Sequence, residues 1–534
     1  MQKTLRVGAP LNSNPLPALQ WVEIATSLQI PSFQIIGLPG PEVAEARERV
    51  KAAIEASGLE FPRRRVVVNL SPASVRKCGA GLDLAMALAV LVAAEDIEPI
   101  PSPFVAWGEL GLDGSVKPSG QLTRALYAAW QAGVPQLLVA KDEFKAAREK
   151  LNLIQKSGEL HGPAPQLFPV STLSEAWKIV RTGFSQNAPQ PPDEKEPVEN
   201  NETATQALKL LPLHSSLERA LGVAAAGNHH VLLLGSRGTG KSHALEWLRA
   251  LQPPPLPATL LRQNILAELA FSSSSENSTL TLTGPIRKVS SQVKSSALIG
   301  GANSFFVRPG EFSLAHGGLL IADELPEWPR DSREALREPL ESGKVTLSRV
   351  RGTFELPARF TLVGTGNLCP CGGWPSNFPL PQLEQKQKLP RCRCPVSARA
   401  KYLSRLSGPV LDRLDLVIFV APPSKAQARK MLEHPSKSTL GALKENVRLA
   451  REKMIEKWGS TAGFLSSTQL EDLISSHSEW GEWLQKIPFT SMRSRHKVLR
   501  LALSLAAWDG IVVPGEIHFT EASFYRPERL GLCE

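Results

Sequence analysis

One stretch of the sequence restricts the fold more than any other: residues 231–242, which read VLLLGSRGTGKS. Its apolar start, Val231–Leu234, predicts a buried strand of the parallel type. The glycine-rich turn that follows matches the spacing G-x-x-x-x-G-K-S, and residues 243–249 have a helical pattern. A strand, a tight turn and a helix in this order predict an α/β fold.

The turn has the residues that a nucleotide phosphate needs. Glycines let backbone N–H groups point at phosphate oxygens, and the following helix adds the positive end of its dipole. We expect Lys241 to reach the β- and γ-phosphates of ATP and Ser242 to bind Mg²⁺. The alternative, a glycine turn without a ligand, is disfavoured by the flanking strand and helix. The predicted nucleotide-binding residues of the turn are Gly235, Ser236, Arg237, Gly238, Thr239, Gly240, Lys241 and Ser242.

Two further strands would complete such a site. Leu319–Ala322 is apolar and is followed by two acids, Asp323 and Glu324. In a strand parallel to the first, Asp323 would lie beside Mg²⁺ and Glu324 beside a hydrolytic water. Two acids after a strand are weak support alone and strong support after a complete phosphate loop. Residues 359–367 predict a third buried strand ending in Asn367, although an asparagine there is usually a turn residue.

The length and composition indicate separate domains. A chain of 534 residues is too long for one hydrophobic core. Residues 1–184 alternate strand and helix patterns and predict an α/β domain of their own. Residues 186–206 are rich in proline, glutamate and asparagine, so they have little apolar surface to bury. We therefore expect a disordered linker at 185–207 and a second module from 208 onward.

Charge and hydropathy limit the partners and the location. The formal net charge of +10 favours a polyanionic partner. The initial residues MQKTLRVGAP lack the apolar core of a signal peptide, and the longest apolar run, residues 84–94, is too short to span a bilayer. Six cysteines are too few for a disulfide scaffold in a chain of this length. We expect a cytoplasmic protein without a membrane segment.

Four of the cysteines form two C-x-C pairs, Cys369 with Cys371 and Cys392 with Cys394. Four thiolates suit a closed tetrahedral Zn²⁺ site, and a metal could hold an otherwise long irregular loop. C-x-C pairs are less diagnostic than C-x-x-C pairs, so four reduced thiols remain the open alternative.

The second module contains, in unbroken order, RPGEFSLAH, GLLIADELPEW, LREPLESGKVTLSRVRG, NLCPCG and SGPVLDRLDL. The first domain contains GLPGPEVAEARERVKAAIEASGLEFP, VVVNLSPA and GELGLDGSV. Together these motifs resemble the ComM family, AAA+ ATPases related to the motor subunit of magnesium chelatase. The resemblance spans nearly the whole chain except the linker and the extreme ends.

The resemblance implies a homo-hexameric ring with ATP at the subunit interfaces. It implies an ATPase core at 208–424, with a helix-2 insertion, a hairpin before sensor 1 and a four-cysteine loop, and a helical lid at 425–534. Asn367 resembles the sensor-1 residue that polarises the attacking water with Glu324. Arg413 resembles the arginine finger that reaches a neighbour's γ-phosphate, and Arg493 resembles the sensor-2 arginine of the lid. Without the resemblance, each arginine would be read as a solvated helix charge.

Two basic segments are candidates for contact with DNA. Residues 344–354 alternate like a hairpin and present Arg349 and Arg351, which by resemblance would line the ring pore. Residues 284–301 resemble the helix-2 insertion and carry Arg287 and Lys288, together with Lys294. Ser290 and Ser291 stand where the family usually has two histidines. Contacts of this kind would go mainly to phosphates and would be sensitive to salt.

The first domain resembles the proteolytic domain of Lon protease, which needs a serine nucleophile and a lysine base. Ala80 falls where the serine would be, and Thr123 falls where the lysine would be. Cys78 is close in sequence but has no evident base. We therefore expect a binding or assembly domain that does not cleave peptides.

These observations together predict an ATP-driven DNA motor that moves branched recombination intermediates, in natural transformation or DNA recombination. One alternative is an ATPase that drives metal insertion into a porphyrin, as in magnesium chelatase. The Lon-like domain and the cysteine segment argue against it. Another alternative is an assembly module gated by ATP without useful turnover, which the intact pair Asp323–Glu324 and Arg413 disfavour.

Overall fold

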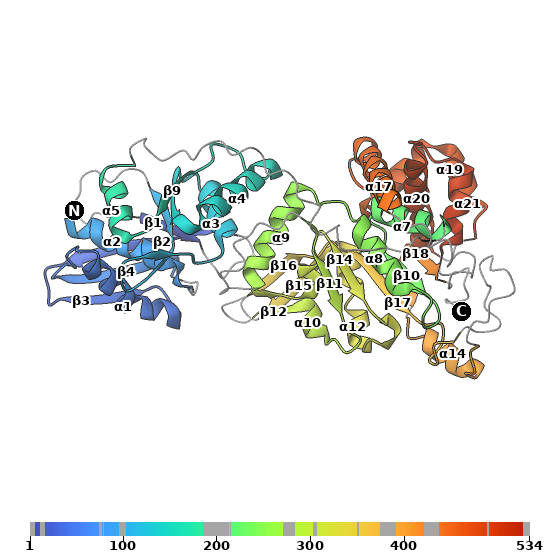
Figure 1. Cartoon of the computed structure of the whole chain (residues 1–534), viewed down its shortest axis with the longest axis horizontal. Coiled ribbons are helices and arrows are strands. Elements are labelled where there is room, and N and C mark those ends of the chain that lie inside the picture. Colours follow the sequence, from blue (N-terminus) through green and yellow to red (C-terminus); the bar gives the residue numbers. More distant parts are fainter. Residues whose placement is uncertain are drawn as a thin grey trace.

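Two β-sheets organise the chain, one in the N-terminal part and one in the central part (Figure 1). The computed structural model describes residues 6–10, 17–73, 77, 79–95, 103–184, 213, 215–270, 283–302, 307–349, 352–373, 391–406, 408–420, 437–488 and 491–526. The predicted linker at 185–207 and Cys78 lie outside these residues. Among the described helices, none combines the length and the apolar character that crossing a bilayer requires.

The N-terminal sheet has seven strands in the order β3-β4-β2-β1-β5-β8-β9. Its strands are β1 (Arg6–Pro10), β2 (Leu19–Ser27), β3 (Ser32–Ile36), β4 (Arg65–Ser71), β5 (Phe104–Trp107), β8 (Gln136–Ala140) and β9 (Gln166–Val170). Strand β2 runs antiparallel to β1 and β4, whereas the other neighbours are parallel. A small ribbon, β6 (Glu109–Leu110) with β7 (Val116–Lys117), lies beside the sheet.

Helices cover this sheet. They are α1 (Pro41–Ala56), α2 (Asp83–Glu95), α3 (Leu122–Gln131), α4 (Phe144–Ser157) and α5 (Leu173–Arg181). Helix α2 is apolar on all sides because it is packed between the sheet, α1 and α5, and its residues from Asp83 to Val92 are buried. The alternation of strand and helix patterns expected in residues 1–184 is confirmed, since strands and helices follow one another along the described part of this range.

The central sheet has five parallel strands in the order β11-β14-β17-β10-β18. They are β10 (Val231–Leu234), β11 (Ile286–Val289), β14 (Leu319–Ala322), β17 (Thr361–Gly366) and β18 (Leu416–Phe419). The predicted strands at Val231–Leu234 and Leu319–Ala322 are confirmed with the same bounds. The strand expected within residues 359–367 is β17, and every one of its residues is buried.

Several short elements complete the central part. The helices are α7 (Ser215–Gly227), α8 (Lys241–Leu251), α9 (Pro257–Ala270), α10 (Ser295–Ile299), α11 (Glu311–Leu314), α12 (Arg330–Glu334), α13 (Arg337–Ser342), α14 (Val396–Leu403) and α15 (Gly408–Leu411). The hairpins are β12 (Gly300–Ala302) with β13 (Val307–Pro309), and β15 (Lys344–Arg349) with β16 (Gly352–Pro357). The hairpin predicted from the alternation at residues 344–354 is therefore confirmed.

The interpretation of residues 284–301 as a helix-2 insertion is wrong for its first part. Residues Ile286–Val289 form β11, the edge strand of the central sheet, in register with Leu319–Ala322 of β14. The physical reason is that backbone pairing with a buried neighbour satisfies this short segment better than an exposed insertion would. The later residues of the segment, in α10 and β12, lie outside the sheet.

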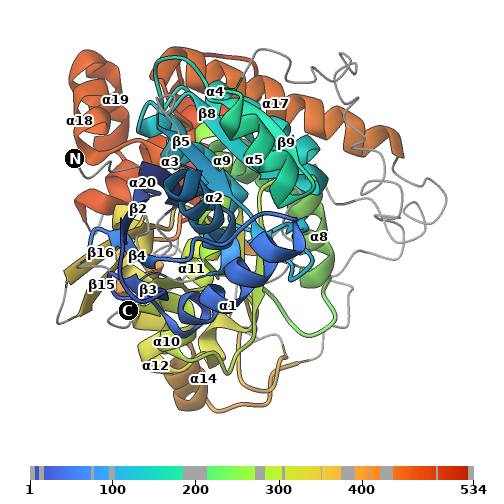
Figure 2. The same cartoon turned by 90° about the vertical axis from the view of Figure 1, so that its left-hand side faces the viewer.

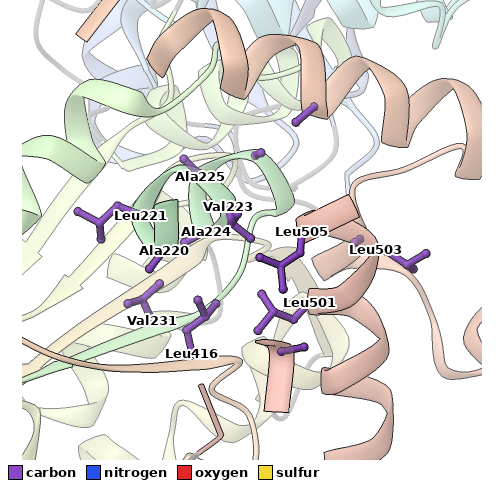
Figure 3. Close-up of a cluster of buried hydrophobic side chains, with 14 of the residues drawn as sticks. Ala220, Leu221, Val223, Ala224, Ala225, Val231, Leu416, Leu501, Leu503 and Leu505 are labelled. Carbon is purple, nitrogen blue, oxygen red and sulfur yellow. The ribbon is translucent and has the colours of Figure 1, made fainter. Parts of the chain in front are cut away.

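The C-terminal part is helical. Its helices are α17 (Lys437–Trp458), α18 (Ser467–Ser476), α19 (Ser478–Gln485), α20 (Met492–Trp508) and α21 (Glu516–Phe524). Helix α20 packs against α7, and Figure 3 shows Leu501 and Leu505 beside the α7 cluster that includes Ala224. The contact is close, since a Cβ on Gly222 would lie 2.1 Å from the Trp508 ring.

Helix α9 belongs to the central part of the chain and packs against both parts. It packs against α3 and α4 on one side and against α11 and β13 on the other. Leu260, Leu261 and Ile265 of α9 belong to the same buried cluster as Leu126 and Ile154 of the N-terminal part. Figure 1 shows α9 between the two sheets, and in Figure 2 the N-terminal sheet lies in front of the central one.

Candidate nucleotide-binding site

The predicted phosphate loop joins β10 to α8 at the carboxyl edge of the central sheet. Gly238 and Gly240 have φ values of +76° and +95°, a region that residues with a Cβ rarely adopt. Gly235 is required for space, because a Cβ there would lie 2.5 Å from the carbonyl oxygen of Val420. Helix α8 begins directly afterwards at Lys241. The loop therefore presents free helix N–H groups to an anion, as a phosphate-binding loop does.

Lys241 links this loop to the neighbouring strand. Its Nζ donates to the carbonyl oxygens of Gly235 and Ser236, each at 2.8 Å, and to Oδ1 of Asn367 at 3.1 Å. Burial lowers the pKa of the Lys241 ammonium, and the carboxylates of Glu324 and Asp323 oppose this shift. The structure thus brings the predicted phosphate lysine and the predicted sensor residue into direct contact.

The two acids follow β14, whose neighbour β17 organises them through Thr365. The Thr365 hydroxyl donates to Oδ1 of Asp323 at 2.8 Å and accepts from the backbone N–H of Glu324 at 3.0 Å. Glu324 has a φ of +50°, a strained conformation for a residue other than glycine. Since strain of this kind persists only where the surroundings enforce it, the hydrogen bond from the Glu324 N–H to Thr365 helps to hold the backbone at Glu324 in this conformation.

The oxygen donors near the loop suit Mg²⁺. Ser242 supplies a hydroxyl in the first turn of α8. Asp323 supplies a carboxylate directly after β14, which is separated from β10 by β17. Hard oxygen ligands of this kind, few in number, are what Mg²⁺ uses when it also binds phosphate. Oδ2 of Asp323 lies 3.3 Å from Nζ of Lys288 in a solvent-exposed ion pair.

The two predicted arginines converge on one carboxylate. Arg493 of α20 lies 2.5 Å from Oε1 of Glu341, and Arg413 forms an ion pair with Oε2 of the same residue. The Arg413 guanidinium holds the pKa of Glu341 below its usual range. Arg413 is mostly buried, whereas the side chains of Arg493 and Glu341 are each 53% exposed. One acid therefore holds the two arginines side by side.

The basic residues predicted to contact DNA fall in different settings. Arg287 makes a two-pronged ion pair with Glu311, at 2.6 and 2.7 Å. Lys288 is the partner of Asp323 noted above, so it lies at the candidate Mg²⁺ site. Arg349 is the last residue of β15, at the tip of the hairpin, and Arg351 lies outside the described residues.

The four clustered cysteines come together in space. Their sulfur atoms all lie within 4.8 Å of one another, and all four are free thiols. The cluster also touches the phosphate loop, because the backbone N–H of Arg237 donates to the carbonyl oxygen of Gly372 at 3.0 Å. The predicted cysteine site and the predicted nucleotide site are thus neighbours.

Two contributing residues were missed in the sequence, and a third, Lys288, was predicted for contact with DNA and not for this site. Thr365, Glu341 and Lys288 hold or contact predicted site residues, but each is separated from its partner by tens of residues. Thr365 had a usable signal, since it lies two positions before Asn367 in the predicted strand at 359–367, and alternate residues of a strand share a face. Glu341 had no such signal, and nothing in the sequence indicated that Lys288 lies beside Asp323.

The five-stranded parallel sheet, the phosphate loop, the two acids and Asn367 define a P-loop ATPase of the AAA+ class. Comparison with known families agrees. Residues 211–428 match the family described as "Magnesium chelatase, subunit ChlI", and residues 22–143 match "Subunit ChlI of Mg-chelatase".

Similar proteins extend this over nearly the whole chain. YifB of Escherichia coli is 30% identical over 98% of this chain and 96% of its own length. Competence protein ComM of Haemophilus influenzae is 29% identical over 95% of this chain and 94% of its own. The magnesium-chelatase 38 kDa subunit of Cereibacter sphaeroides is 32% identical over 26% of this chain and 44% of its own. The chain belongs to the ComM/YifB family of magnesium chelatase-related AAA+ ATPases.

Proposed function

We propose that this protein is an ATP-driven motor that assembles as a homo-hexameric ring and moves branched DNA, acting in the branch migration of recombination intermediates. The observation that carries the proposal is the contact of Lys241 with Asn367, together with the hydrogen bond from the Glu324 N–H to Thr365 of β17, the strand that Asn367 follows directly. This arrangement supports turnover of ATP as well as its binding. The similarity to a protein named for competence supports a role with DNA.

In this proposal each residue has one task. The N–H groups of the loop and Lys241 hold the β- and γ-phosphates, and Ser242 and Asp323 hold Mg²⁺. Mg²⁺ supplies charge that neutralises the transferred phosphoryl group. Glu324 accepts a proton from the attacking water, and Asn367 orients that water.

The paired arginines support a ring. A phosphoryl transition state carries negative charge that an arginine from a neighbouring subunit can stabilise. We assign Arg413 as the finger and Arg493 as the sensor-2 residue of a helical lid formed by residues 425–534. Because Glu341 binds both guanidinium groups, a γ-phosphate from the neighbour would compete with Glu341 for them.

DNA would pass through the ring and be held mainly through its phosphates. We assign the hairpin residues Arg349 and Arg351 as the principal contacts. Arg287 and Lys288 are weaker candidates, because Glu311 and Asp323 already neutralise them.

The N-terminal domain, with its Lon-like fold, serves in this proposal for docking and not for peptide cleavage. The backbone N–H of Thr123, at the position of the missing lysine, donates to Glu268 of α9. The position that the lysine occupies in Lon protease is therefore hydrogen-bonded here to helix α9 of the central part. The proposed location is the cytoplasm, and the proposed cofactors are ATP and Mg²⁺.

The test is ATP turnover and strand exchange by the purified protein on three-way and four-way DNA junctions. Turnover should rise with branched DNA, and Lys241→Ala and Glu324→Gln should abolish both activities. Lys51→Ala, an exposed lysine on α1, is the matched control and should behave like the unchanged protein. Turnover that ignored every DNA would favour a chelatase-like motor, and ATP binding without turnover would favour an assembly module.

A further inference from the structure

We infer that Cys369, Cys371, Cys392 and Cys394 form a structural Zn²⁺ site that holds the phosphate loop in its binding conformation. The first half of this inference, metal binding, is independent of the proposed function. The second half, support of the loop, rests on the proposed binding of ATP.

The distances between sulfur atoms suit a single metal ion. Sγ of Cys371 lies 3.1 Å from that of Cys369 and 3.7 Å from that of Cys392. A tetrahedral site with Zn–S bonds of about 2.3 Å places its sulfur atoms about 3.8 Å apart. Sulfur atoms in a disulfide lie about 2 Å apart, so these distances do not describe one. The Cys369 and Cys371 sulfurs would move apart slightly, and any pair farther apart than about 3.8 Å would move together, to place all four on one ion.

The same contact between a backbone N–H and a sulfur occurs in both arms of the cluster, residues 369–373 and residues 391–394. The N–H of Gly373 points at Sγ of Cys371, and the N–H of Cys394 points at Sγ of Cys392, each at 3.4 Å. An N–H group aimed at a sulfur stabilises the thiolate form, which is the form that binds metal. The same contact in two arms that lie 21 residues apart is difficult to explain by packing alone.

Glycine allows the two arms to meet. A Cβ on Gly373 would lie 2.9 Å from the backbone nitrogen of Cys392, closer than a side chain tolerates. The arms are thus packed backbone against backbone. A metal that joined them would close the loop between them, which otherwise costs chain entropy.

The donor set selects the metal. All four ligands are thiols, and no histidine or carboxylate of the described residues belongs to the cluster. Four thiolates in a tetrahedron select Zn²⁺ or iron, and Zn²⁺ needs no redox partner and makes closed structural sites of this type.

The same loop holds the nucleotide site. The carbonyl oxygen of Gly372, the residue directly after Cys371, accepts from the N–H of Arg237 in the phosphate loop at 3.0 Å. Gly372 has a φ of +75°, and a Cβ there would lie 2.7 Å from Cγ of Arg237. Cys369 is buried two residues after Asn367, which contacts Lys241. Releasing the metal should therefore loosen two sides of the nucleotide site at once.

The first experiment measures metal in the full-length protein, produced with Zn²⁺ in the medium and purified without chelator. Elemental analysis should find about one Zn²⁺ per chain, in keeping with one four-thiolate site. Replacing Zn²⁺ by Co²⁺ should give the absorption bands of tetrahedral thiolate Co²⁺. Iron in place of Zn²⁺, no stoichiometric metal, or disulfides between these cysteines would overturn the inference.

The second experiment tests ligands and consequence. Cys371→Ser with Cys392→Ser should lose the metal, whereas Cys533→Ser, outside the cluster, should keep it. Affinity for a fluorescent ATP analogue should fall at least about fivefold when metal is lost, the effect of one lost hydrogen bond. Gly372→Ala should keep the metal but weaken nucleotide affinity, because it disturbs only the contact with Arg237.

These readouts separate the inference from the proposed function. Metal content and Co²⁺ spectra require neither turnover nor DNA, and the unchanged protein can be tested if the double variant does not fold. Two results would overturn only the claim that the metal site supports the phosphate loop. They are unchanged nucleotide affinity in Gly372→Ala that retains its metal, and full nucleotide affinity in metal-free protein.

Discussion

Two helices of this protein begin in similar ways and are used differently. At the start of α8, the phosphate loop leaves backbone N–H groups available, and Ser242 is exposed. At the start of α3, the N–H groups of Thr123 and Arg124 donate to the carboxylate of Glu268, at 2.9 and 3.1 Å. A helix N-terminus attracts an anion in either case. In α8 the anion is a ligand's phosphate, and in α3 it is a side chain from the neighbouring part of the chain.

The difference lies in burial. Glu268 and Lys150 form an ion pair at 3.0 Å, with exposed fractions of only 4% and 1%. Helix α9 therefore anchors the N-terminal part with a carboxylate that has a helix end and a lysine as partners. A permanent anion closes a helix end and makes it structural, whereas glycines that keep the end open make it a binding site.

The largest expected effect concerns the nucleotide site at the start of α8. Glu324→Gln should reduce ATP turnover by about 10²–10⁴-fold, the usual contribution of a general base. ATP affinity and the free energy of unfolding should stay nearly unchanged, because the amide keeps the shape of the side chain. Steady-state turnover and equilibrium nucleotide binding measure this. Glu327→Gln, an exposed acid nearby, is the control, and equal losses in both variants would contradict the role given to Glu324.

The next largest effect concerns the start of α3, where Glu268 accepts from the helix N–H groups. Glu268→Ala leaves the buried Lys150 unpaired, and breaking such a pair costs about 3–5 kcal/mol of stability. Urea denaturation followed by tryptophan fluorescence should show the loss in the transition of the N-terminal part. Glu55→Ala, an exposed glutamate on a helix, should change little.

A double variant sharpens this result. Glu268→Leu with Lys150→Met removes both charges and should recover only the part of the loss that comes from the unpaired Lys150. The N–H groups of Thr123 and Arg124 lose their acceptor in this variant as well, so the rest of the loss should remain. If Glu268→Ala were as stable as the unchanged protein, α9 would not be the anchor described here.

The pH dependence of the two parts should have opposite signs. Burial raises the pKa of Asp83 to about 6 and that of Glu143 to about 7. These N-terminal groups bind protons more tightly in the folded state, so their contribution is complete below their ordinary values of 3.8 and 4.5 and is lost as the pH rises toward 7. Burial lowers the pKa of His230 and of His316 to about 4. Their contribution to the central part is complete above 6.5 and is lost as the pH falls toward 4.

Lowering the pH from 7 to 5 should thus stabilise the N-terminal sheet and destabilise the central one, each by roughly 1–3 kcal/mol. Hydrogen exchange, corrected for the intrinsic rate at each pH, should show slower opening in β5 and β8 and faster opening in β10 and β17. Opening free energies that moved together in both sheets would contradict this assignment of buried groups.

The smallest effect on stability is expected at the partly exposed edge of the contact between α9 and the N-terminal part. Arg262 of α9 pairs with Glu159 at 2.9 Å, and the side chains are 35% and 18% exposed. Arg262→Ala should cost less than about 1 kcal/mol, because solvent screens pairs of this kind. A cost equal to that of Glu268→Ala would show that this contact is held by its partly exposed edge and not by its buried pair.

Much of the ATP site could be predicted because its parts are local. Apolar runs followed by glycines, acids or Asn367 mark the ends of parallel strands, and such ends meet at one edge of a sheet. The position of Thr365 in a strand could be predicted, but not its hydrogen bonds to Asp323 and Glu324, nor the pairing of Lys288 with Asp323. Those contacts depend on which strands become neighbours, as β11 shows: its residues were expected in an insertion and form the sheet edge.

The sequence by itself determined where backbone N–H groups stay free, since the conformations at Gly238 and Gly240 are a property of glycine. It also determined which residues could bind Mg²⁺ or a soft metal, because that is side-chain chemistry. Only the tertiary structure decided that Glu268 closes α3, that Glu341 joins Arg413 to Arg493, and that Gly372, beside the cysteines, contacts the phosphate loop. The reason is that these contacts join distant segments, and a carboxylate or thiol carries no local mark of its partner until packing brings the two together.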